Sequence, residues 1–368
     1  MKNNIKNIIK KTPLEYCYRL STKYNCNVFL KREDLQTVRS FKIRGAYNKI
    51  IKNYNTNEFV TASAGNHAQG VAYTCNKLNL KCSIFVPENT PLQKIARIKY
   101  FGNNECNLII KGNNFNEALE LSNKYCNENN GVFVHPYDDI DIIEGQANIA
   151  TEILDEIKPD IVMASIGGGG LISGLIKKLK DDLHSSCDVY GTEPIGAASM
   201  HQSIKNNKLV TLDVIDNFVD GASVNTPGKI TFEITKKVKD IFMVSNGELC
   251  NEMINLYQNE GIIAEPAGAL SICGLSKLNK DYIKNKNIVC IISGGNNDVM
   301  RYPEIFENNL RYLKLKHYFL IKFKQIPGEL SNYIKYVLTS NSDITRFEYI
   351  KKNNRESGSV LIGIELNN

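Results

Sequence analysis

The sequence predicts an α/β protein with a mainly parallel sheet, followed by a small C-terminal unit of a different kind. From residue 28 to about 300, short runs of strand type alternate with longer segments of helical period, a pattern typical of parallel sheets. After about residue 313 the order becomes β-α-β-β, in a unit that is small for a stable domain of its own. At 368 residues the chain has room for two or three units of domain size.

In the first part, each predicted strand is followed by turn residues or by a helical segment. The run EFVTASA at 58–64, followed by HAQGVAYTCNKLN at 67–79, is the clearest example. The other predicted strands are 28–31, 81–86, 108–111, 132–135, 160–166, 188–192 and 287–293. The opening residues 1–11 alternate lysines with isoleucines, which predicts a short amphipathic helix. A transit peptide is disfavoured, because these residues include no arginine or serine.

The last part of the chain begins with a polar segment, 301–313, which predicts a linker or a connecting helix. A strand at 317–323 and a turn at Pro327-Gly328 follow. The next residues carry an apolar helical stripe, formed by Leu330, Tyr333, Ile334, Val337 and Leu338. Strands at 343–350 and 359–366 complete the unit.

Composition excludes several classes of protein. The 45 basic and 39 acidic residues leave a formal charge of only +6 without a block of like charges, so we expect no nucleic-acid partner. No stretch approaches the roughly 18 to 20 apolar residues of a membrane helix, so we expect no membrane association. The ten cysteines include no C-x-x-C pair and no metal-like spacing with histidine, which indicates free thiols and a cytoplasmic location.

Lys42 lies in the segment SFKIRGA, at the start of a predicted helix. A cation at this position opposes the helix dipole by about 0.3 to 1 kcal/mol, and Arg39 and Arg44 flank it. We expect this position at the helix start, with its two flanking arginines, to lower the pKa of the amine and increase its neutral fraction, as attack on a carbonyl requires. A solvated lysine without a special role is the alternative.

Small residues follow the strand at 58–64. Ser63, Ala64 and Gly65 precede Asn66 and His67 at a predicted helix start, where exposed main-chain amides suit a carboxylate. Taken alone, Ser63 is equally well explained as an N-cap and Asn66 as a turn residue.

Four successive glycines, Gly167, Gly168, Gly169 and Gly170, stand between a strand and a helical segment that begins at Leu171. Such a run costs backbone entropy and contributes no packing, which indicates that a ligand approaches the main chain closely. A phosphate held by main-chain N–H groups fits this position. The spacing matches neither the G-x-G-x-x-G fingerprint nor the Walker pattern, so a dinucleotide or nucleoside triphosphate is not expected. A tight turn is the alternative.

Ser293 ends the apolar strand NIVCIIS and is followed by two glycines, which allow a flat ligand near its hydroxyl. In isolation, a structural turn explains these residues equally well. Together the four loops supply an activated lysine, a carboxylate site, a phosphate site and a neutral hydroxyl, all at strand ends. Pyridoxal 5'-phosphate uses all four, since it forms a Schiff base with lysine, is anchored by its phosphate and stabilises amino-acid carbanions.

These segments resemble the fold-type-II pyridoxal-phosphate enzymes and, within them, the biosynthetic threonine dehydratases (threonine ammonia-lyases). The likeness covers nearly the whole chain and includes LKRED at 30–34, GTEP at 191–194, EPAG at 265–268, PGEL at 327–330 and DITRFEY at 343–349. It implies a tryptophan-synthase-β-like catalytic domain at 1–312 with two open parallel-sheet subdomains, the smaller one spanning roughly 45–145. It also implies an ACT-like regulatory domain at 313–368.

The resemblance implies roles for individual residues. Lys42 carries the cofactor as an internal aldimine, Phe41 packs beside the cofactor ring, and Asn66 hydrogen-bonds the 3-hydroxyl. Ser293 faces the pyridine nitrogen, and because serine does not protonate it, the cofactor favours elimination over transamination. The residues that hold the phosphate are Gly167, Gly168, Gly169, Gly170 and Leu171. The residues whose main chain binds the substrate carboxylate are Ser63, Ala64 and Gly65.

Two features depart from the family pattern. The ACT-like unit of the family continues through another helix and strand, whereas this one ends at Asn368 after β-α-β-β. We therefore expect a truncated unit with an exposed sheet edge, which calls for a partner subunit and puts control by isoleucine or valine in question. Some relatives hold a cation through an acidic residue shortly after the pair that corresponds to Glu193-Pro194; IGAAS follows here, and no metal is predicted. The family suggests a homotetramer.

The implied reaction is β-elimination of water from L-threonine, which gives 2-oxobutanoate and ammonia in the first step of isoleucine biosynthesis, with Lys42 as general base. An L-serine dehydratase or a serine racemase of the same fold is a first alternative, because the one methyl group that distinguishes threonine from serine changes the free energy of binding by only about 1 to 3 kcal/mol. A non-catalytic amino-acid sensor is a second alternative. A Rossmann-type dehydrogenase is a third, which the failed fingerprint disfavours.

Overall fold

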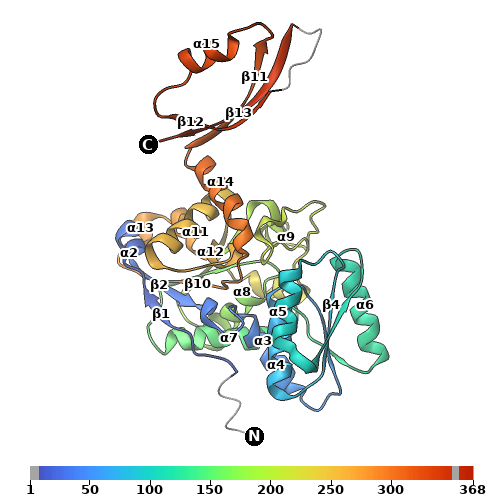
Figure 1. Cartoon of the computed structure of the whole chain (residues 1–368). Coiled ribbons are helices and arrows are strands. Elements are labelled where there is room, and N and C mark those ends of the chain that lie inside the picture. Colours follow the sequence, from blue (N-terminus) through green and yellow to red (C-terminus); the bar gives the residue numbers. More distant parts are fainter. Residues whose placement is uncertain (1–7, 350–355, 368) are drawn as a thin grey trace. The chain divides into compact units, whose positions relative to one another are not determined.

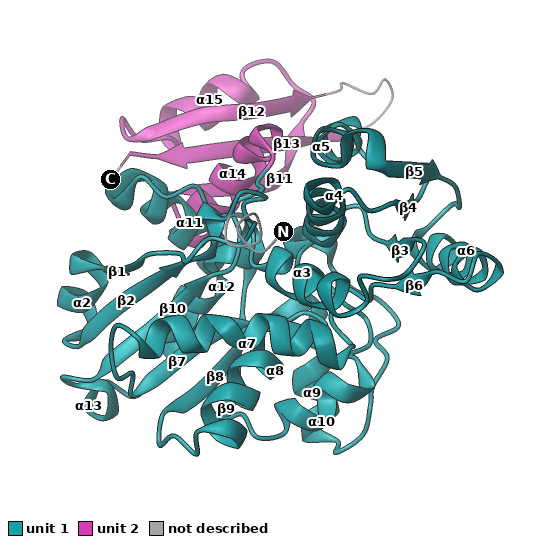
Figure 2. Cartoon of the chain, turned by 90° about the horizontal axis from the view of Figure 1, so that it is seen from below, with its two compact units in different colours: residues 1–297 teal, residues 298–368 magenta. Residues whose placement is uncertain are grey.

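The computed structural model describes residues 8–349 and 356–367. Two compact units are present, Met1–Asn297 and Asp298–Asn368 (Figure 1, Figure 2). The first unit contains two mainly parallel sheets, and the second contains a small antiparallel sheet. The predicted fold class is therefore confirmed. Among the described residues, no helix is long and apolar enough to cross a membrane.

The larger sheet of the first unit has six strands in the order β1-β2-β10-β7-β8-β9. Neighbouring strands run parallel, except that β1 pairs antiparallel with β2. Their bounds are β1 Leu14–Tyr16, β2 Asn27–Arg32, β7 Ile161–Ser165, β8 Asp188–Pro194, β9 Asp240–Val244 and β10 Asn287–Ile292. The central strands β7 and β10 are apolar and buried almost throughout, as expected of a parallel sheet covered on both faces.

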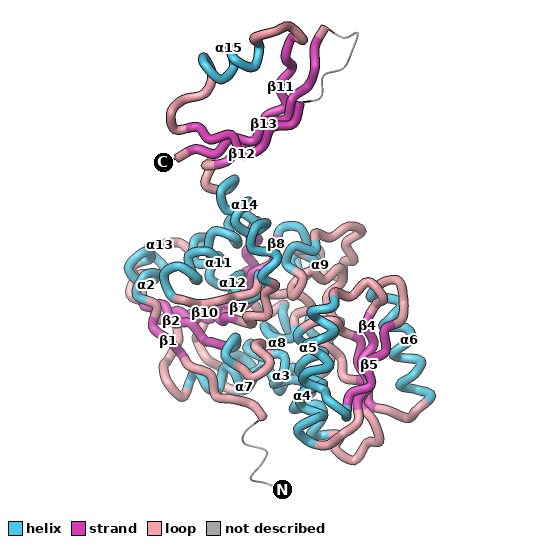
Figure 3. The backbone as a smooth tube through the Cα atoms, in the orientation of Figure 1, coloured by secondary structure: helices cyan, strands magenta, loops and turns pink. Residues whose placement is uncertain are grey.

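The smaller sheet has four parallel strands in the order β5-β4-β3-β6. Their bounds are β3 Phe59–Ala62, β4 Cys82–Val86, β5 Cys106–Ile110 and β6 Val132–Phe133. In both sheets the strands alternate with helices along the chain, as Figure 3 shows.

The helices of the first unit lie against these sheets, with α11 and α12 on one side of the larger sheet and α7 and α8 on the other (Figure 1). Their bounds are α2 Tyr18–Tyr24, α3 Lys42–Lys52, α4 Asn66–Leu78, α5 Leu92–Gly102, α6 Phe115–Glu128, α7 Ile140–Leu154, α8 Gly170–Ile176, α9 Ser199–Lys205, α10 Lys229–Thr235, α11 Asn246–Glu260, α12 Pro266–Cys273 and α13 Lys280–Ile283. A π-helical segment, Lys177–Asp182, continues α8. Side-chain caps set several helix starts, for example Asp139 at α7 and a Ser245–Glu248 capping box at α11.

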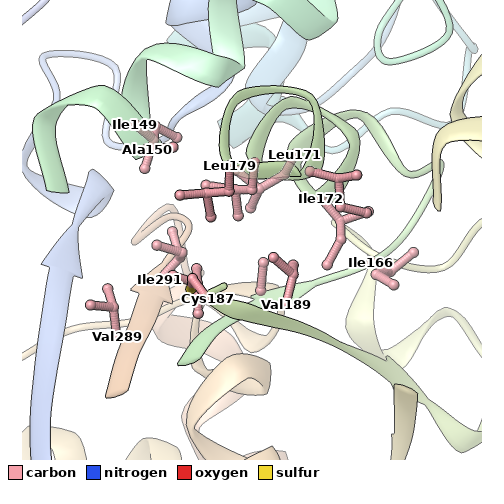
Figure 4. Close-up of a cluster of buried hydrophobic side chains, with 14 of the residues drawn as sticks. Ile149, Ala150, Ile166, Leu171, Ile172, Leu179, Cys187, Val189, Val289 and Ile291 are labelled. Carbon is pink, nitrogen blue, oxygen red and sulfur yellow. The ribbon is translucent and has the colours of Figure 1, made fainter. Parts of the chain in front are cut away.

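The largest hydrophobic core of the first unit lies between α7, α8 and the larger sheet (Figure 4). Ile149 and Ala150 of α7 and Leu171 and Ile172 of α8 belong to it, together with Val289 and other residues of the sheet. Every residue of α8 is buried. The helix that follows the four glycines is therefore held firmly in place, and its N-terminus has a fixed position.

The second unit consists of α14 Tyr302–Tyr312, α15 Glu329–Tyr336 and a three-stranded antiparallel sheet in the order β11-β13-β12. The strands are β11 Lys316–Lys324, β12 Ser342–Tyr349 and β13 Ser357–Leu366. Its core contains Phe323, Tyr333, Val360, Ile362 and Ile364. The predicted apolar stripe of α15 is only half covered, because Tyr333 is buried while Ile334 and Val337 are 49% and 59% exposed.

The fold differs from the predicted elements in four places. Of the predicted N-terminal helix, residues 1–7 lie outside the described part of the chain, and for 8–11 the prediction was wrong. The side-chain amide of Gln36 bonds both the N–H and the C=O of Lys10, so these groups are not free for helical bonds. The short strands β1 and β9 were not predicted, and β6 is only two residues long.

Candidate active site

Three of the four predicted loops meet through direct hydrogen bonds. The N–H of Phe41 donates to the carbonyl of Ser293 at 3.0 Å, and Ser40 and Gly294 form an isolated antiparallel bridge. The side chain of Asn296, three residues after Ser293, donates to Oδ1 of Asn66 at 2.8 Å. The lysine loop, the Asn66 loop and the Ser293 loop thus form one continuous surface.

The glycine loop joins this surface through a segment that follows β6. Lys42 Nζ donates to the carbonyl of Pro136 at 2.8 Å. The next residue, Tyr137, lies so close to Gly168 that a Cβ atom on Gly168 would overlap its ring. On the other side, Ser165 at the end of β7 donates to Oγ of Ser293 at 3.3 Å. All four predicted loops therefore surround one site, at the carboxyl ends of β3, β7 and β10.

Lys42 is the first residue of α3, as predicted. Burial lowers the pKa of its amine to about 8, and the carboxylate of Glu265 opposes this shift. The predicted direction is confirmed, but the flanking arginines are not among its causes. Arg44 is not free to act on Lys42, because its charge is paired with carboxylates. Removal of the amine from water, rather than repulsion by flanking arginines, provides its neutral fraction.

Arg44 is the centre of a buried ion-pair network just behind Lys42. Its guanidinium donates to both oxygens of Glu33 at 2.7 and 2.8 Å, and to both oxygens of Glu152 at 2.7 and 2.8 Å. Lys31 Nζ also donates to Glu152, at 2.7 Å, and Thr12 donates to Glu33 at 2.6 Å. This network ties the first turn of α3 to β2 and α7.

Asn66 is held by hydrogen bonds at both ends of its amide. Nδ2 donates to Oε1 of Glu265 at 2.6 Å, while Oδ1 accepts from Asn296. Burial raises the pKa of Glu265 to about 7, and the hydrogen bond from Asn66 partly offsets this shift.

The glycine loop leaves no room for side chains. A Cβ atom on Gly167 would lie 2.9 Å from Cα of Ala222, and one on Gly169 would lie 2.7 Å from Met200 and 2.8 Å from Thr231. Gly169 is also the N-cap of α8, with a φ of 93° and no side-chain cap. The first N–H groups of α8 have no acceptor within the helix, so the loop presents donors of the kind that bind phosphate.

We expect Gly169→Ala to weaken the binding of pyridoxal 5'-phosphate by about tenfold or more, because the left-handed backbone and the crowding both distort the loop. Titration of the purified protein with the cofactor, followed by absorbance, measures this. Gly328→Ala is the matched control, since Gly328 has the same φ of 93° with nothing within 4 Å of its Cβ position among the described residues. Equal cofactor affinity in the two variants would contradict the role of the loop.

Ser63, Ala64 and Gly65 lie between β3 and α4, and all three are half-buried. Ser63 Oγ accepts from the N–H of Gly65 at 3.2 Å, so one of the predicted anion-binding amides has an internal partner in this structure. Ser293 is buried, and its hydroxyl donates to the carbonyl of Ala267 at 3.1 Å.

Sequence reasoning missed several residues of the site. The pair Pro136-Tyr137 follows a predicted strand and could have been found by inspecting that strand end. Thr231, whose hydroxyl donates to the carbonyl of Gly168 at 2.6 Å, carries no comparable signal. Glu265 was seen only as part of the EPAG segment, and Asn296 follows Ser293 and its two glycines without a signal of its own. The contacts of both with Asn66 depend on the tertiary fold.

Two family models match the chain. The model of a pyridoxal-phosphate dependent enzyme matches residues 5–294, and the model of the C-terminal regulatory domain of threonine dehydratase matches residues 307–368. The biosynthetic L-threonine dehydratase IlvA of Staphylococcus epidermidis is 49% identical over 98% of this chain and 88% of its own length. The enzyme of the same name from Staphylococcus aureus is 48% identical over the same shares.

Solved structures agree with these matches. The processed form of threonine deaminase isoform 2 from Solanum lycopersicum has a TM-score of 0.78 at 34% identity, covering 83% of this chain and 89% of its own. Maize serine racemase has a TM-score of 0.76 at 26% identity, covering 85% of this chain and 96% of its own. The chain belongs to the family of pyridoxal-phosphate dependent enzymes, among the biosynthetic threonine dehydratases, and carries their C-terminal regulatory domain.

Proposed function

We propose that the protein is a threonine ammonia-lyase that converts L-threonine to 2-oxobutanoate and ammonia, the first step of isoleucine biosynthesis. The observation that carries this proposal is the buried amine of Lys42, with its lowered pKa, beside a glycine loop and a serine hydroxyl at the strand ends. The sequence identity of 48 to 49% to biosynthetic threonine dehydratases, over nearly the full chain, supports threonine as the substrate.

The residues present fit pyridoxal 5'-phosphate. The glycine loop has space only for main chain, at a helix start without a side-chain cap, which suits the phosphate. Phe41 lies beside Lys42, with Nζ 5.3 Å from the ring centroid, where it would pack against the cofactor ring. In our proposal Gly167, Gly168, Gly169, Gly170 and Leu171 hold the phosphate, Asn66 the 3-oxygen, and Ser293 the ring nitrogen.

When bound, the cofactor supplies an electron sink for the carbanion that forms at Cα of the amino acid. The protein contributes binding and proton transfer. The main chain of Ser63, Ala64 and Gly65 binds the substrate carboxylate, which fixes the Cα–H bond near Lys42. Lys42, once free and neutral, removes the α-proton as general base, a contribution typically worth about 10² to 10⁴ in rate. Ser293, a neutral group, leaves the ring nitrogen unprotonated.

The pKa of Lys42 predicts how the cofactor-free protein captures pyridoxal 5'-phosphate. Only the neutral amine attacks an aldehyde, and a pKa of about 8 makes the neutral fraction rise until pH 8 and then level off. We expect the capture rate to increase about tenfold from pH 6 to pH 7 and to change little above pH 9. Stopped-flow absorbance measures it, with Nα-acetyl-lysine as the control amine. A rate that still rises steeply between pH 9 and 10 would show an ordinary lysine.

One experiment tests the reaction itself. The absorption spectrum of the purified protein is recorded before and after addition of L-threonine, with detection of 2-oxo acid in the same cuvette. L-Serine as a parallel substrate, with a chiral assay for D-serine, tests the serine dehydratase and serine racemase alternatives. A protein without cofactor absorbance that still binds isoleucine would favour the amino-acid sensor, and tight binding of NAD would favour the dehydrogenase.

The regulatory domain indicates that an effector binds. We propose isoleucine or valine as that effector and a homotetramer as the assembly. We also propose a cytoplasmic location, supported by ten cysteines that are all free thiols. The domain limits of 1–312, with a smaller subdomain at roughly 45–145, and 313–368 also stay predictions.

A further inference from the structure

A chain of four side chains crosses the site from one sheet to the other. Arg97 on α5 donates to Oδ1 of Asn296 at 3.3 Å, and Asn296 Nδ2 donates to Oδ1 of Asn66 at 2.8 Å. Asn66 Nδ2 then donates to Oε1 of Glu265 at 2.6 Å. Asn66 and Arg97 belong to helices that pack on the smaller sheet, whereas Asn296 follows β10 and Glu265 precedes α12.

The residues at the two ends of this series of hydrogen bonds determine its direction, that is, which side-chain groups donate and which accept. An arginine side chain only donates hydrogen bonds, and above its raised pKa of about 7 Glu265 is a carboxylate that only accepts them. Asn296 must therefore turn its oxygen toward Arg97, and its Nδ2 has a second acceptor in the carbonyl of Val38, at 2.8 Å. With the Nδ2 of Asn296 facing it, Asn66 presents its oxygen to Asn296 and its own Nδ2 to Glu265. The orientation of the Asn66 amide follows from its neighbours, before any ligand binds.

The carboxylate of Glu265 lies directly against the main chain of Gly294. A Cβ atom on Gly294 would overlap Oε1 of Glu265, so a side chain at 294 would displace the carboxylate from this position. The N–H of Glu265 donates to the carbonyl of Gly294 at 3.1 Å, which fixes the start of α12 beside the Ser293 loop. The charged groups that act on this carboxylate are Asp220, Lys94 and Lys42.

An amide nitrogen carries two hydrogens, and Glu265 takes one of those on Asn66. We propose that Glu265 and Asn296 are positioning residues that hold the Asn66 amide so that its second N–H, and not its C=O, faces the 3-oxygen of the cofactor. This proposal rests on the proposed function and deepens it, because the donor set at that oxygen controls how the cofactor binds and absorbs light. A reversed amide would instead place an oxygen against an oxygen.

Three variants of the full-length protein test the direction of this series of hydrogen bonds. Asn296→Asp turns a donor into an acceptor, so Asn66 must flip and its oxygen then meets the Glu265 carboxylate. Glu265→Gln keeps an acceptor for Asn66, and the unflipped chain stays complete. The double variant N296D/E265Q restores the hydrogen bonds of Asn66 in the reverse direction, because the amide introduced by E265Q can donate to the flipped Asn66, while the carbonyl of Val38 still lacks its donor. Thermal unfolding without added cofactor and titration with pyridoxal 5'-phosphate, followed by absorbance, are measured for each well above pH 7, where Glu265 is ionised.

We expect E265Q to keep the absorption maximum of the wild type, because Asn66 keeps its orientation when only the charge that acts on Lys42 is lost. N296D should unfold at a lower temperature, and the double variant should recover part of that loss. Its affinity for pyridoxal 5'-phosphate should nevertheless stay about tenfold or more below the wild type, with a displaced absorption maximum, because the wrong end of Asn66 faces the 3-oxygen. Recovery of wild-type affinity and absorption together with stability would overturn the proposal.

A second pair of variants covers the case in which N296D does not fold. Glu265→Met removes the acceptor at similar size, whereas Glu265→Gln keeps it. We expect weaker cofactor binding and a displaced absorption maximum in E265M alone. Identical spectra and affinities in the two variants would overturn the proposal. Failure of the wild type to bind pyridoxal 5'-phosphate at all would contradict the proposed function itself, so the two failures are distinguishable.

Discussion

Replacing Lys42 by alanine should abolish both turnover of L-threonine and the visible absorption of the bound cofactor. Alanine removes the amine that, in our proposal, forms a covalent link with the aldehyde and takes the α-proton; in the structure this amine donates to the carbonyl of Pro136 and has a lowered pKa. Loss of the base alone typically costs about 10² to 10⁴ in rate, and loss of the covalent link adds to this. Formation of 2-oxo acid, measured by absorbance in the purified variant, gives the residual rate.

Lys52→Ala is the matched control for this variant. Lys52 ends the same helix, but its side chain is 43% exposed and pairs with the carboxylates of Asp141 and Glu144. Surface ion pairs of this kind contribute little, so this variant should keep wild-type turnover. Borohydride treatment of the wild type followed by peptide mapping should place the label on Lys42. A label on another lysine, or full activity of the Lys42→Ala variant, would contradict the assignment.

The fold and the meeting of the four loops could be predicted from the sequence, because both depend on local patterns. Strand ends, glycine runs and the helix start at Lys42 are properties of neighbouring residues, and the structure brings these segments together as the parallel-sheet rule requires. The expected N-terminal helix failed because its outcome depends on Gln36, which lies 26 residues from Lys10. Contacts of that range are not visible in residue order.

The electrostatics of the site could be predicted in direction only. Arg39 and Arg44 are the obvious charges next to Lys42 in sequence, yet Arg44 is neutralised by Glu33 and Glu152, and Glu152 lies 108 residues away. The charge that does act on Lys42 is that of Glu265, which lies more than 200 residues away in sequence and acts in the opposite direction. Burial, the dominant cause, exists only in the folded chain.

Arg44→Met is expected to destabilise the first unit by about 3 to 5 kcal/mol, because it leaves buried carboxylates without their guanidinium. Arg44 is 1% exposed as a side chain, and Glu33 is fully buried. Methionine fills a similar volume, so the loss reports charge rather than a cavity. Urea unfolding at pH 7 measures it. Lys237→Met, which breaks a half-exposed pair with Asp181, should cost less than about 1 kcal/mol.

The pH dependence of this loss distinguishes the ion-pair network from simple packing. Hydrogen bonds and charge from Arg44 and Lys31 hold the pKa of Glu152 below its ordinary value of 4.5. A carboxyl with a lowered folded pKa contributes stability above its unfolded pKa and loses it as the pH falls through the folded value. The gap between wild type and Arg44→Met should therefore be complete at pH 7 and narrow below pH 4.5. If the difference in stability between wild type and Arg44→Met stayed constant with pH, Arg44 would act through packing. The first turn of α3, which carries Lys42, would then be held in place without the charge of Arg44.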